Sequence, residues 1–248
     1  MGQILVAVKT EAGLMGYGVG GGGAAGVHIV RTVLRDVLVG KENEPIEKHW
    51  QAMYDATLPF GRKGVAIMAL SAVDLALWDL RGKSAGQSVA QLLGGPIHQK
   101  IPTYATVWDE IPEDLLGKHP AYKIHLGKKS DKDVQPLLDV VAKARSQVGP
   151  EVGLMVDAWM KWDVPFTLRF AKAALQYKLD WIEEPLPPDD FAGYEELAKS
   201  CPIPIAGGEH EFTAKAFVEL MDRKLHAVVQ PDVCWCGGIT QLDRKSVV

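Results

Sequence analysis

Three acidic residues recur at intervals of 26 positions and could bind a metal ion together. They are Asp157, Glu183 and Glu209, and each ends a short apolar run. A step of about this length accommodates one strand, one helix and two loops, which is the repeat of a parallel (β/α) barrel. Carboxylates at the carboxyl ends of adjacent strands converge on the place where such barrels carry out chemistry. Because carboxylate oxygens suit Mg²⁺, the spacing predicts a magnesium site.

Lys123, His125 and Asp232 lie on other predicted strands of the same repeat. Lys123 and His125 stand two positions apart, so they share one face of their strand. His125 could act as an acid or base near neutral pH, or it could hold the substrate by a polar contact, and the sequence leaves both roles open. Asp232 ends the last predicted strand. Charged groups at buried strand ends cost free energy unless they are paired or bound to a metal, so packing alone does not explain them.

Short apolar segments alternate with amphipathic helices after Lys100. The predicted strands are 101–105, 121–126, 153–158, 179–184, 203–208 and 227–232. The predicted helices between them are 132–148, 165–177, 193–200 and 213–224. This alternation indicates an α/β fold with a parallel sheet. Six strands are fewer than the eight of a closed barrel, so the barrel is predicted to be incomplete.

The first hundred residues show a different pattern. A β-hairpin is predicted over 3–18, and helices are predicted over 27–39, 45–57, 64–82 and 88–93. The last of these helices ends at Gly94, Gly95 and Pro96, which together stop a helix. We therefore predict an N-terminal α+β domain over 1–97 and a barrel domain over 98–242.

Composition excludes several classes of protein. The chain has 248 residues, a net charge of −4 and no long basic run, so no nucleic-acid partner is expected. It has no apolar stretch long enough to cross a membrane. The three cysteines, Cys201, Cys234 and Cys236, are odd in number, which indicates reduced thiols and a cytoplasmic location.

The segments around these residues resemble the enolase superfamily, and in particular its mandelate racemase-like branch. The matching segments are Val73–Lys83, Gln91–Gly95, Trp181–Pro185, Gly207–His210 and Gln230–Gly238. Within this branch, Asp157–Met160 and Gly193–Leu197 are most similar to the L-rhamnonate dehydratases. The resemblance covers nearly the whole chain, as far as Gln241.

The resemblance implies an enolase-type (β/α) barrel that follows a partial capping domain. It implies that Asp157, Glu183 and Glu209 bind Mg²⁺ as the cofactor, and that His210 and Trp159 contact the substrate. The implied reaction is that of a lyase in carbohydrate-acid catabolism. The enzyme removes the proton next to a carboxylate and eliminates water, which leaves a 2-keto-3-deoxy sugar acid.

Proton transfer is implied to involve Lys123, His125 and Asp232. Branch members often carry two lysines where this chain has Lys123 and His125. Rhamnonate dehydratases resemble the racemase in using a His–Asp dyad, whose aspartate matches Asp232. The histidine of that dyad is expected one strand–helix unit later, beyond Val248, so we expect this chain by itself to be inactive.

Both ends of the chain look short of the family pattern. One strand and a substrate-covering loop are expected before Met1, and a helix is expected after Gln241. The last residues, 243–248, are interpreted as a non-native tail. An incomplete barrel has two exposed sheet edges, which favour aggregation. Family members usually assemble, so a homo-oligomer is expected for the full-length protein.

Two other functions fit the same residues. The chain could belong to a racemase, or to a dehydratase for another aldonate or aldarate, of the same branch. Lys123 opposite a second base would favour the racemase. The chain could also be a barrel-derived protein that binds a metal without catalysis. For the racemase and for the other dehydratase the partner is a small-molecule sugar acid, and neither nucleic acid nor a membrane is involved.

Overall fold

The structure is a computed structural model, and it describes residues 2–41, 44–126 and 133–243. Within these residues the chain forms two compact units. Unit 1 contains the residues up to Gln99, Glu209–Glu219 and those from Pro231 onward, and unit 2 contains Lys100–Gly208 and Leu220–Gln230. The predicted domains, 1–97 and 98–242, stay predictions. Except for its first residue, the predicted tail lies outside the described residues.

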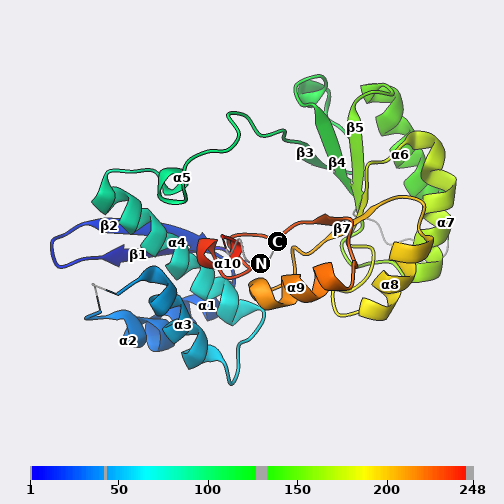
Figure 1. The fold of residues 1–248 in the computed structure, drawn as a ribbon. Coiled ribbons are helices and arrows are strands. Elements are labelled where there is room, and N and C mark those ends of the chain that lie inside the picture. The colour runs from blue at the N-terminus through cyan, green and yellow to red at the C-terminus, as the bar shows by residue number, and fades with distance from the viewer. Residues whose placement is uncertain (1, 42–43, 127–132, 244–248) are drawn as a thin grey trace. The chain divides into compact units, whose positions relative to one another are not determined.

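Unit 2 is built on a parallel sheet whose strands follow one another in sequence order (Figure 1). In the described part of the chain the six strands are β3 (Ala105–Trp108), β4 (Ala121–His125), β5 (Gly153–Asp157), β6 (Ile182–Glu183), β7 (Ile205–Gly207) and β8 (Val228–Val229). Every neighbouring pair is parallel. Among these residues β3 and β8 do not pair with each other, so the barrel is incomplete. The predicted fold class is confirmed.

Helices connect the strands of unit 2 and cover its sheet. They are α6 (Gln135–Val148), α7 (Val164–Ala174) and α8 (Phe191–Ser200), with short 3-10 turns at η2 (Glu113–Leu115) and η3 (Leu175–Tyr177). Helix α9 (Thr213–Asp222) precedes β8 in the sequence, and most of it belongs to unit 1. Figure 1 shows α6, α7 and α8 side by side. Helix α6 buries Leu137 and Val141, which lie on one stripe of the helix. Asp163 caps α7 by accepting a hydrogen bond from the Phe166 N–H at 2.7 Å. In the described ranges, no helix has the length and apolar character that crossing a membrane requires.

The first strand of the sheet begins later than the sequence indicates. The apolar run that starts at Ile101 predicted a strand there, but Ile101 is 76% exposed and β3 begins at Ala105. Pro102 has no N–H to donate to a strand ladder, which works against pairing in this run. The shift places Trp108 at the carboxyl end of β3, level with His125 of β4.

Unit 1 packs a long helix against a β-hairpin. Its elements are β1 (Ile4–Lys9), β2 (Met15–Gly20), α1 (Gly23–Ile29), η1 (Val30–Leu34), α2 (Arg35–Leu38), α3 (Ile46–Thr57), α4 (Val65–Ala85), α5 (Val89–Leu92) and α10 (Ile239–Leu242). A Cβ on Gly18 would lie 2.1 Å from the carbonyl oxygen of Ala72, and one on Gly20 would lie 2.4 Å from that of Met68. The glycines of β2 therefore allow the hairpin to approach the backbone of α4 closely.

Asp74 of α4 holds the segment 237–240 inside unit 1. Its carboxylate accepts a hydrogen bond from the backbone N–H of Thr240 at 3.0 Å and another from the Thr240 hydroxyl. One helical turn earlier, the Ser71 hydroxyl oxygen accepts a hydrogen bond from the N–H of Gly237 at 2.9 Å. Asp74 is fully buried, and burial raises its pKa to about 7 although the bonds from Thr240 act in the opposite direction.

The raised pKa of Asp74 predicts a pH-dependent stability. Its folded-state pKa of about 7 exceeds the ordinary value of 3.8, so the folded protein keeps this proton where the unfolded chain has lost it. The stabilisation that this bound proton gives to the folded state is complete below the ordinary pKa of 3.8 and is lost as the pH rises through 7. We therefore expect Asp74→Asn, which keeps the shape and cannot ionise, to melt at an increasingly higher temperature than the wild type as the pH is raised from about 4.5 to about 8.

Circular dichroism melts at several pH values measure this difference. The exposed Asp36 of unit 1 gives a matched control, since Asp36→Asn removes a surface carboxylate and no buried one. A melting-temperature difference between Asp74→Asn and the wild type that stays constant with pH contradicts the assignment.

Candidate functional site

Four of the predicted site residues lie together at the carboxyl edge of the sheet in unit 2. Lys123 and His125 are on β4, Asp157 ends β5 and Glu183 ends β6. In the strand ladder His125 is level with Asp157, and Asp157 is level with Glu183. Residues at the same level of neighbouring strands point to the same face, so these side chains meet. The convergence expected from the sequence spacing is thus present for two of the three acids.

Lys123 lies between the two carboxylates. Its Nζ is 2.6 Å from Glu183 Oε1 and 3.9 Å from Asp157 Oδ2. All three residues are buried, and buried charges are tolerated only when they are paired. Burial acts to lower the pKa of Lys123, but Glu183, Tyr104 and Asp157 outweigh it and raise the pKa above its ordinary value. The ammonium form of Lys123 is therefore the stable one here.

His125 and the backbone of Trp159 share the carboxylate of Asp157. His125 Nδ1 lies 3.0 Å from Asp157 Oδ2, and the N–H of Trp159 donates to Asp157 Oδ1 at 2.9 Å. A neutral imidazole whose Nδ1 carries the proton would donate to Asp157, which makes Nε2 the basic nitrogen. The arrangement resembles other carboxylate–histidine pairs in which the acid fixes the tautomer and the orientation of the ring.

Gln230 also belongs to this cluster, although no role for it was predicted from the sequence. Its Nε2 donates to Glu183 Oε2 at 2.9 Å and lies 3.4 Å from the Tyr104 hydroxyl. With Lys123 on Oε1, both oxygens of Glu183 have a donor. The signal available was position alone, since Gln230 lies in the predicted strand 227–232, two residues before Asp232, and directly follows β8. Such donors orient a carboxylate for metal binding.

Glu184 lies in different surroundings from Glu183, near His226. Its φ is 38°, in the left-handed region, as the chain leaves β6. Burial lowers the pKa of His226 to about 4, and the charge of Glu184 acts in the opposite direction. The His226 ring packs edge-on against Tyr194, with the ring centroids 4.6 Å apart. The two adjacent glutamates therefore act on different partners.

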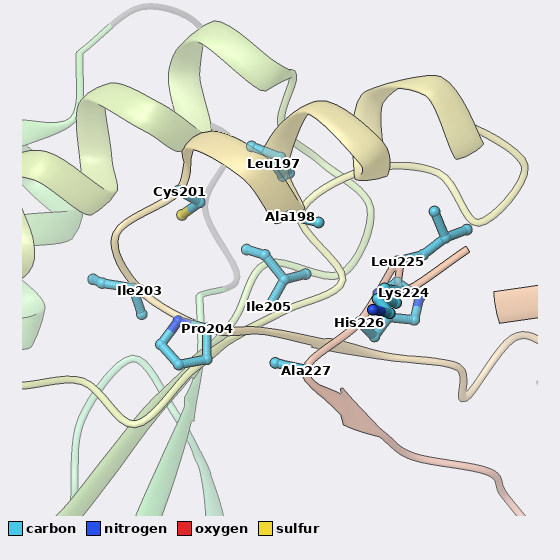
Figure 2. A pocket seen from close by; sticks show the side chains of 10 residues that line it. All are labelled: Leu197, Ala198, Cys201, Ile203, Pro204, Ile205, Lys224, Leu225, His226 and Ala227. Carbon is cyan, nitrogen blue, oxygen red and sulfur yellow. The ribbon is translucent and has the colours of Figure 1, made fainter. Parts of the chain in front are cut away.

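A pocket of about 270 Å³ lies at the other edge of this sheet, where the chain enters β7 and β8 (Figure 2). Its lining comes from α8, from the segment before β7 and from the segment before β8: Leu197, Ala198, Cys201, Ile203–Ile205 and Lys224–Ala227. Burial raises the pKa of Cys201, which keeps its thiol protonated. Because Asp157 and Glu183 stand at the carboxyl ends of parallel strands, this pocket is not part of their site.

Of the other predicted site residues, Trp159 belongs to unit 2, and the rest belong to unit 1. Those in unit 1 are Glu209, His210 and Asp232. Asp232 Oδ1 accepts a hydrogen bond from the N–H of Cys234 at 2.7 Å, and the His210 ring lies 5.4 Å from the Trp235 ring between centroids. Their roles beside the cluster of unit 2 stay predictions from the sequence.

The donor set of unit 2 fits Mg²⁺. Asp157 and Glu183 are 6% and 2% exposed, and the Lys123 ammonium compensates only one of their two charges. A buried carboxylate pair with surplus negative charge is stabilised by a cation. Carboxylate oxygens are the protein ligands that Mg²⁺ takes, so Asp157 and Glu183 are suitable ligands.

Comparison with known families gives two matches along the chain. The family described as mandelate racemase / muconate lactonizing enzyme, N-terminal domain, matches residues 2–94. The family described as enolase C-terminal domain-like matches residues 111–245, which is more than half of the chain.

Individual relatives are similar over nearly the whole chain. L-rhamnonate dehydratase of Saccharopolyspora erythraea is 40% identical over 253 residues, which cover 100% of this chain and 65% of that protein. The structure of rhamnonate dehydratase from Gibberella zeae complexed with Mg superposes with a TM-score of 0.90 at 30% identity, over 99% of this chain and 61% of that one. A racemase from Streptomyces coelicolor A3(2) with bound magnesium superposes with a TM-score of 0.88 at 35% identity, over 99% of this chain and 71% of that one.

The chain thus spans less than two thirds of the length of these two rhamnonate dehydratases. The chain nevertheless matches both the N-terminal and the C-terminal domain family. The chain belongs to the mandelate racemase/muconate lactonizing enzyme family of the enolase superfamily.

Proposed function

We propose that the protein is a Mg²⁺-dependent lyase that dehydrates a sugar acid, with L-rhamnonate or a related aldonate as substrate. The observation that carries this proposal is the buried cluster of Lys123, His125, Asp157 and Glu183 at one edge of the sheet. It combines metal-ligating carboxylates with two groups able to hold or move a proton. The 40% identity to an L-rhamnonate dehydratase supports the class of substrate.

Asp157 and Glu183 would hold Mg²⁺, and Glu209 remains the third ligand that the sequence predicts. When bound there, the ion would supply positive charge that offsets the substrate carboxylate and lowers the cost of removing the proton beside it. Breaking that C–H bond leaves its electron pair on the substrate and places the proton on a base. Departure of the neighbouring hydroxyl as water needs a proton from an acid. The resulting enol becomes the 2-keto-3-deoxy acid.

Lys123 and His125 differ in what they offer to this reaction. Lys123 is held as an ammonium by Glu183, so it is suited to stabilise negative charge or to donate a proton. His125 is oriented by Asp157 through Nδ1, so its Nε2 is suited to accept or return a proton. Asp232 remains the proposed partner of a further histidine, and His210 and Trp159 remain proposed substrate contacts.

A racemase is the second candidate. The similarity to the Streptomyces coelicolor racemase, at 35% identity, favours it, as does the presence of Lys123 beside the candidate metal ligands. A racemase removes the proton next to the carboxylate and returns a proton to the opposite face of that carbon, without loss of water. A cytoplasmic location and assembly into a homo-oligomer are further parts of the proposal that rest on the sequence.

The metal site is tested by removing one carboxylate charge. Asp157→Asn keeps the size of the side chain and an acceptor for His125, but it loses a charged ligand. We expect Mn²⁺ affinity, measured by electron paramagnetic resonance with Mg²⁺ as competitor, to fall by roughly tenfold or more. Asp163→Asn is the matched control, because asparagine also caps a helix and Asp163 serves α7. Equal Mn²⁺ affinity of Asp157→Asn and the wild type contradicts the assignment.

The role of Gln230 is tested in the same assay. Gln230→Leu leaves Glu183 Oε2 without its amide donor, so the carboxylate is no longer held in one orientation. We expect metal affinity to fall by about tenfold. Gln176→Leu changes an exposed glutamine of the same unit and should leave the affinity unchanged. If Gln230→Leu binds the metal as tightly as the wild type, Gln230 does not position the ligand.

The reaction class is tested in D₂O with Mg²⁺ and a set of aldonates and aldarates. The chain is used in excess over substrate so that slow single turnovers by Lys123 and His125 are detected. We expect nuclear magnetic resonance to show a 2-keto-3-deoxy acid formed from an aldonate. Deuterium next to the carboxylate with every hydroxyl retained would establish the racemase instead. Metal binding with no change in any acid would leave a metal-binding protein without catalysis.

A further inference from the structure

Trp108 lies at the edge of the candidate site, and no role for it was predicted from the sequence. The strand ladder puts Trp108 of β3 level with His125 of β4, and His125 level with Asp157 of β5. Residues at the same level of adjacent strands point to the same face. The indole of Trp108 is therefore presented on the side of the sheet where Asp157 and His125 lie.

Two indole rings flank the His125 imidazole. The Trp108 ring centroid is 6.0 Å from that of His125 with the planes tilted by 51°, and the Trp159 ring centroid is 5.9 Å away at 63°. Trp108 is 67% exposed and Trp159 is 42% exposed. Large aromatic surface next to a polar cluster is a common feature of sites that bind small molecules. We call Trp108 and Trp159 the indole pair.

The backbone holds Trp159 in an unfavourable conformation beside the cluster. Trp159 and Met160 have φ values of 46° and 61°, which bulky residues rarely adopt. The turn is fixed by the bond from the Trp159 N–H to Asp157 Oδ1 and by the bond from the Met160 N–H to the carbonyl of Glu184 at 2.6 Å. Strain that is maintained by its surroundings in this way is typical of functional sites.

The chemistry of an indole face decides which part of a ligand it accepts. The face carries partial negative charge, so it attracts cations and C–H groups and repels carboxylates. Lys161 Nζ, 5.4 Å from the centroid of the Trp159 ring, is an example of such a cation. In a sugar acid whose carboxylate is held at the metal ligands, the remaining chain offers C–H groups and, in a 6-deoxy acid, a methyl group.

We propose that the indole pair binds the C–H face of the sugar chain and selects monocarboxylic sugar acids with an apolar end over aldarates, whose second carboxylate it repels. This inference rests on the proposed function, because it assumes that the carboxylate of a sugar acid binds at Asp157 and Glu183. Trp108 is the residue that adds specificity. It belongs to a different strand from the metal ligands, and its side chain is the more exposed of the two.

Isothermal titration calorimetry in the presence of Mg²⁺ tests the proposal with L-rhamnonate and galactarate as probes. We expect Trp108→Ala to weaken L-rhamnonate binding by about tenfold and to change galactarate binding by less than about twofold. Trp108→Phe, which keeps an aromatic face, should retain most of the affinity for L-rhamnonate. Leu175→Ala removes an exposed apolar side chain of the same unit and serves as the matched control.

The possible outcomes separate the two proposals. Mg²⁺ affinity and the circular dichroism spectrum of Trp108→Ala should equal those of the wild type, which shows that the metal site and the fold are intact. If the wild type binds L-rhamnonate and Trp108→Ala binds it as tightly, or loses both ligands equally, the indole pair is not the selector and the proposed function stands. If the wild type binds neither acid in Mg²⁺, the proposed function and the inference fail together.

Discussion

The ion pair between Lys123 and Glu183 is the interaction on which the carboxyl edge of the sheet depends. It joins β4 to β6 across β5, with 2.6 Å between Lys123 Nζ and Glu183 Oε1. β6 has only two residues in the ladder, so its backbone hydrogen bonds alone stabilise its place in the sheet weakly. Removing one partner of such a buried pair typically costs about 3–5 kcal/mol, because the other charge is left without compensation. The pair therefore fixes the strand ends and the orientation of Glu183 together.

The positions of the charged residues could be predicted from the sequence because they follow from the repeat of the fold. A parallel sheet brings every strand to the same edge, so an acid that ends each apolar run must lie near the others. Lys123, His125, Asp157 and Glu183 meet for this reason. Glu183 belongs to this cluster, whereas the neighbouring Glu184 acts on His226.

The partners of these residues could not be predicted in the same way. Gln230 bonds Glu183 across 47 positions of sequence, and a neutral amide after a two-residue strand gives no pattern to detect. Trp108 was missed because the apolar run from Ile101 looked like the strand, while the ladder begins at Ala105. Unit 1 combines stretches that lie far apart in the sequence, and hydrogen bonds such as that from Thr240 to Asp74, 166 positions apart, join them. A domain boundary drawn at one position of the sequence cannot describe such a unit.

The carboxylate of Asp157 places different constraints on the two members of the indole pair. One of its oxygens is near His125 and the other accepts the N–H of Trp159, so the turn that carries Trp159 is built on a candidate metal ligand. A change in that turn disturbs the carboxylate and with it metal binding. Trp108 belongs to β3 and is tied to the cluster through the strand ladder and its contact with His125. Its side chain can therefore vary with less effect on Asp157, and substrate selection can change at Trp108 while the metal site is preserved.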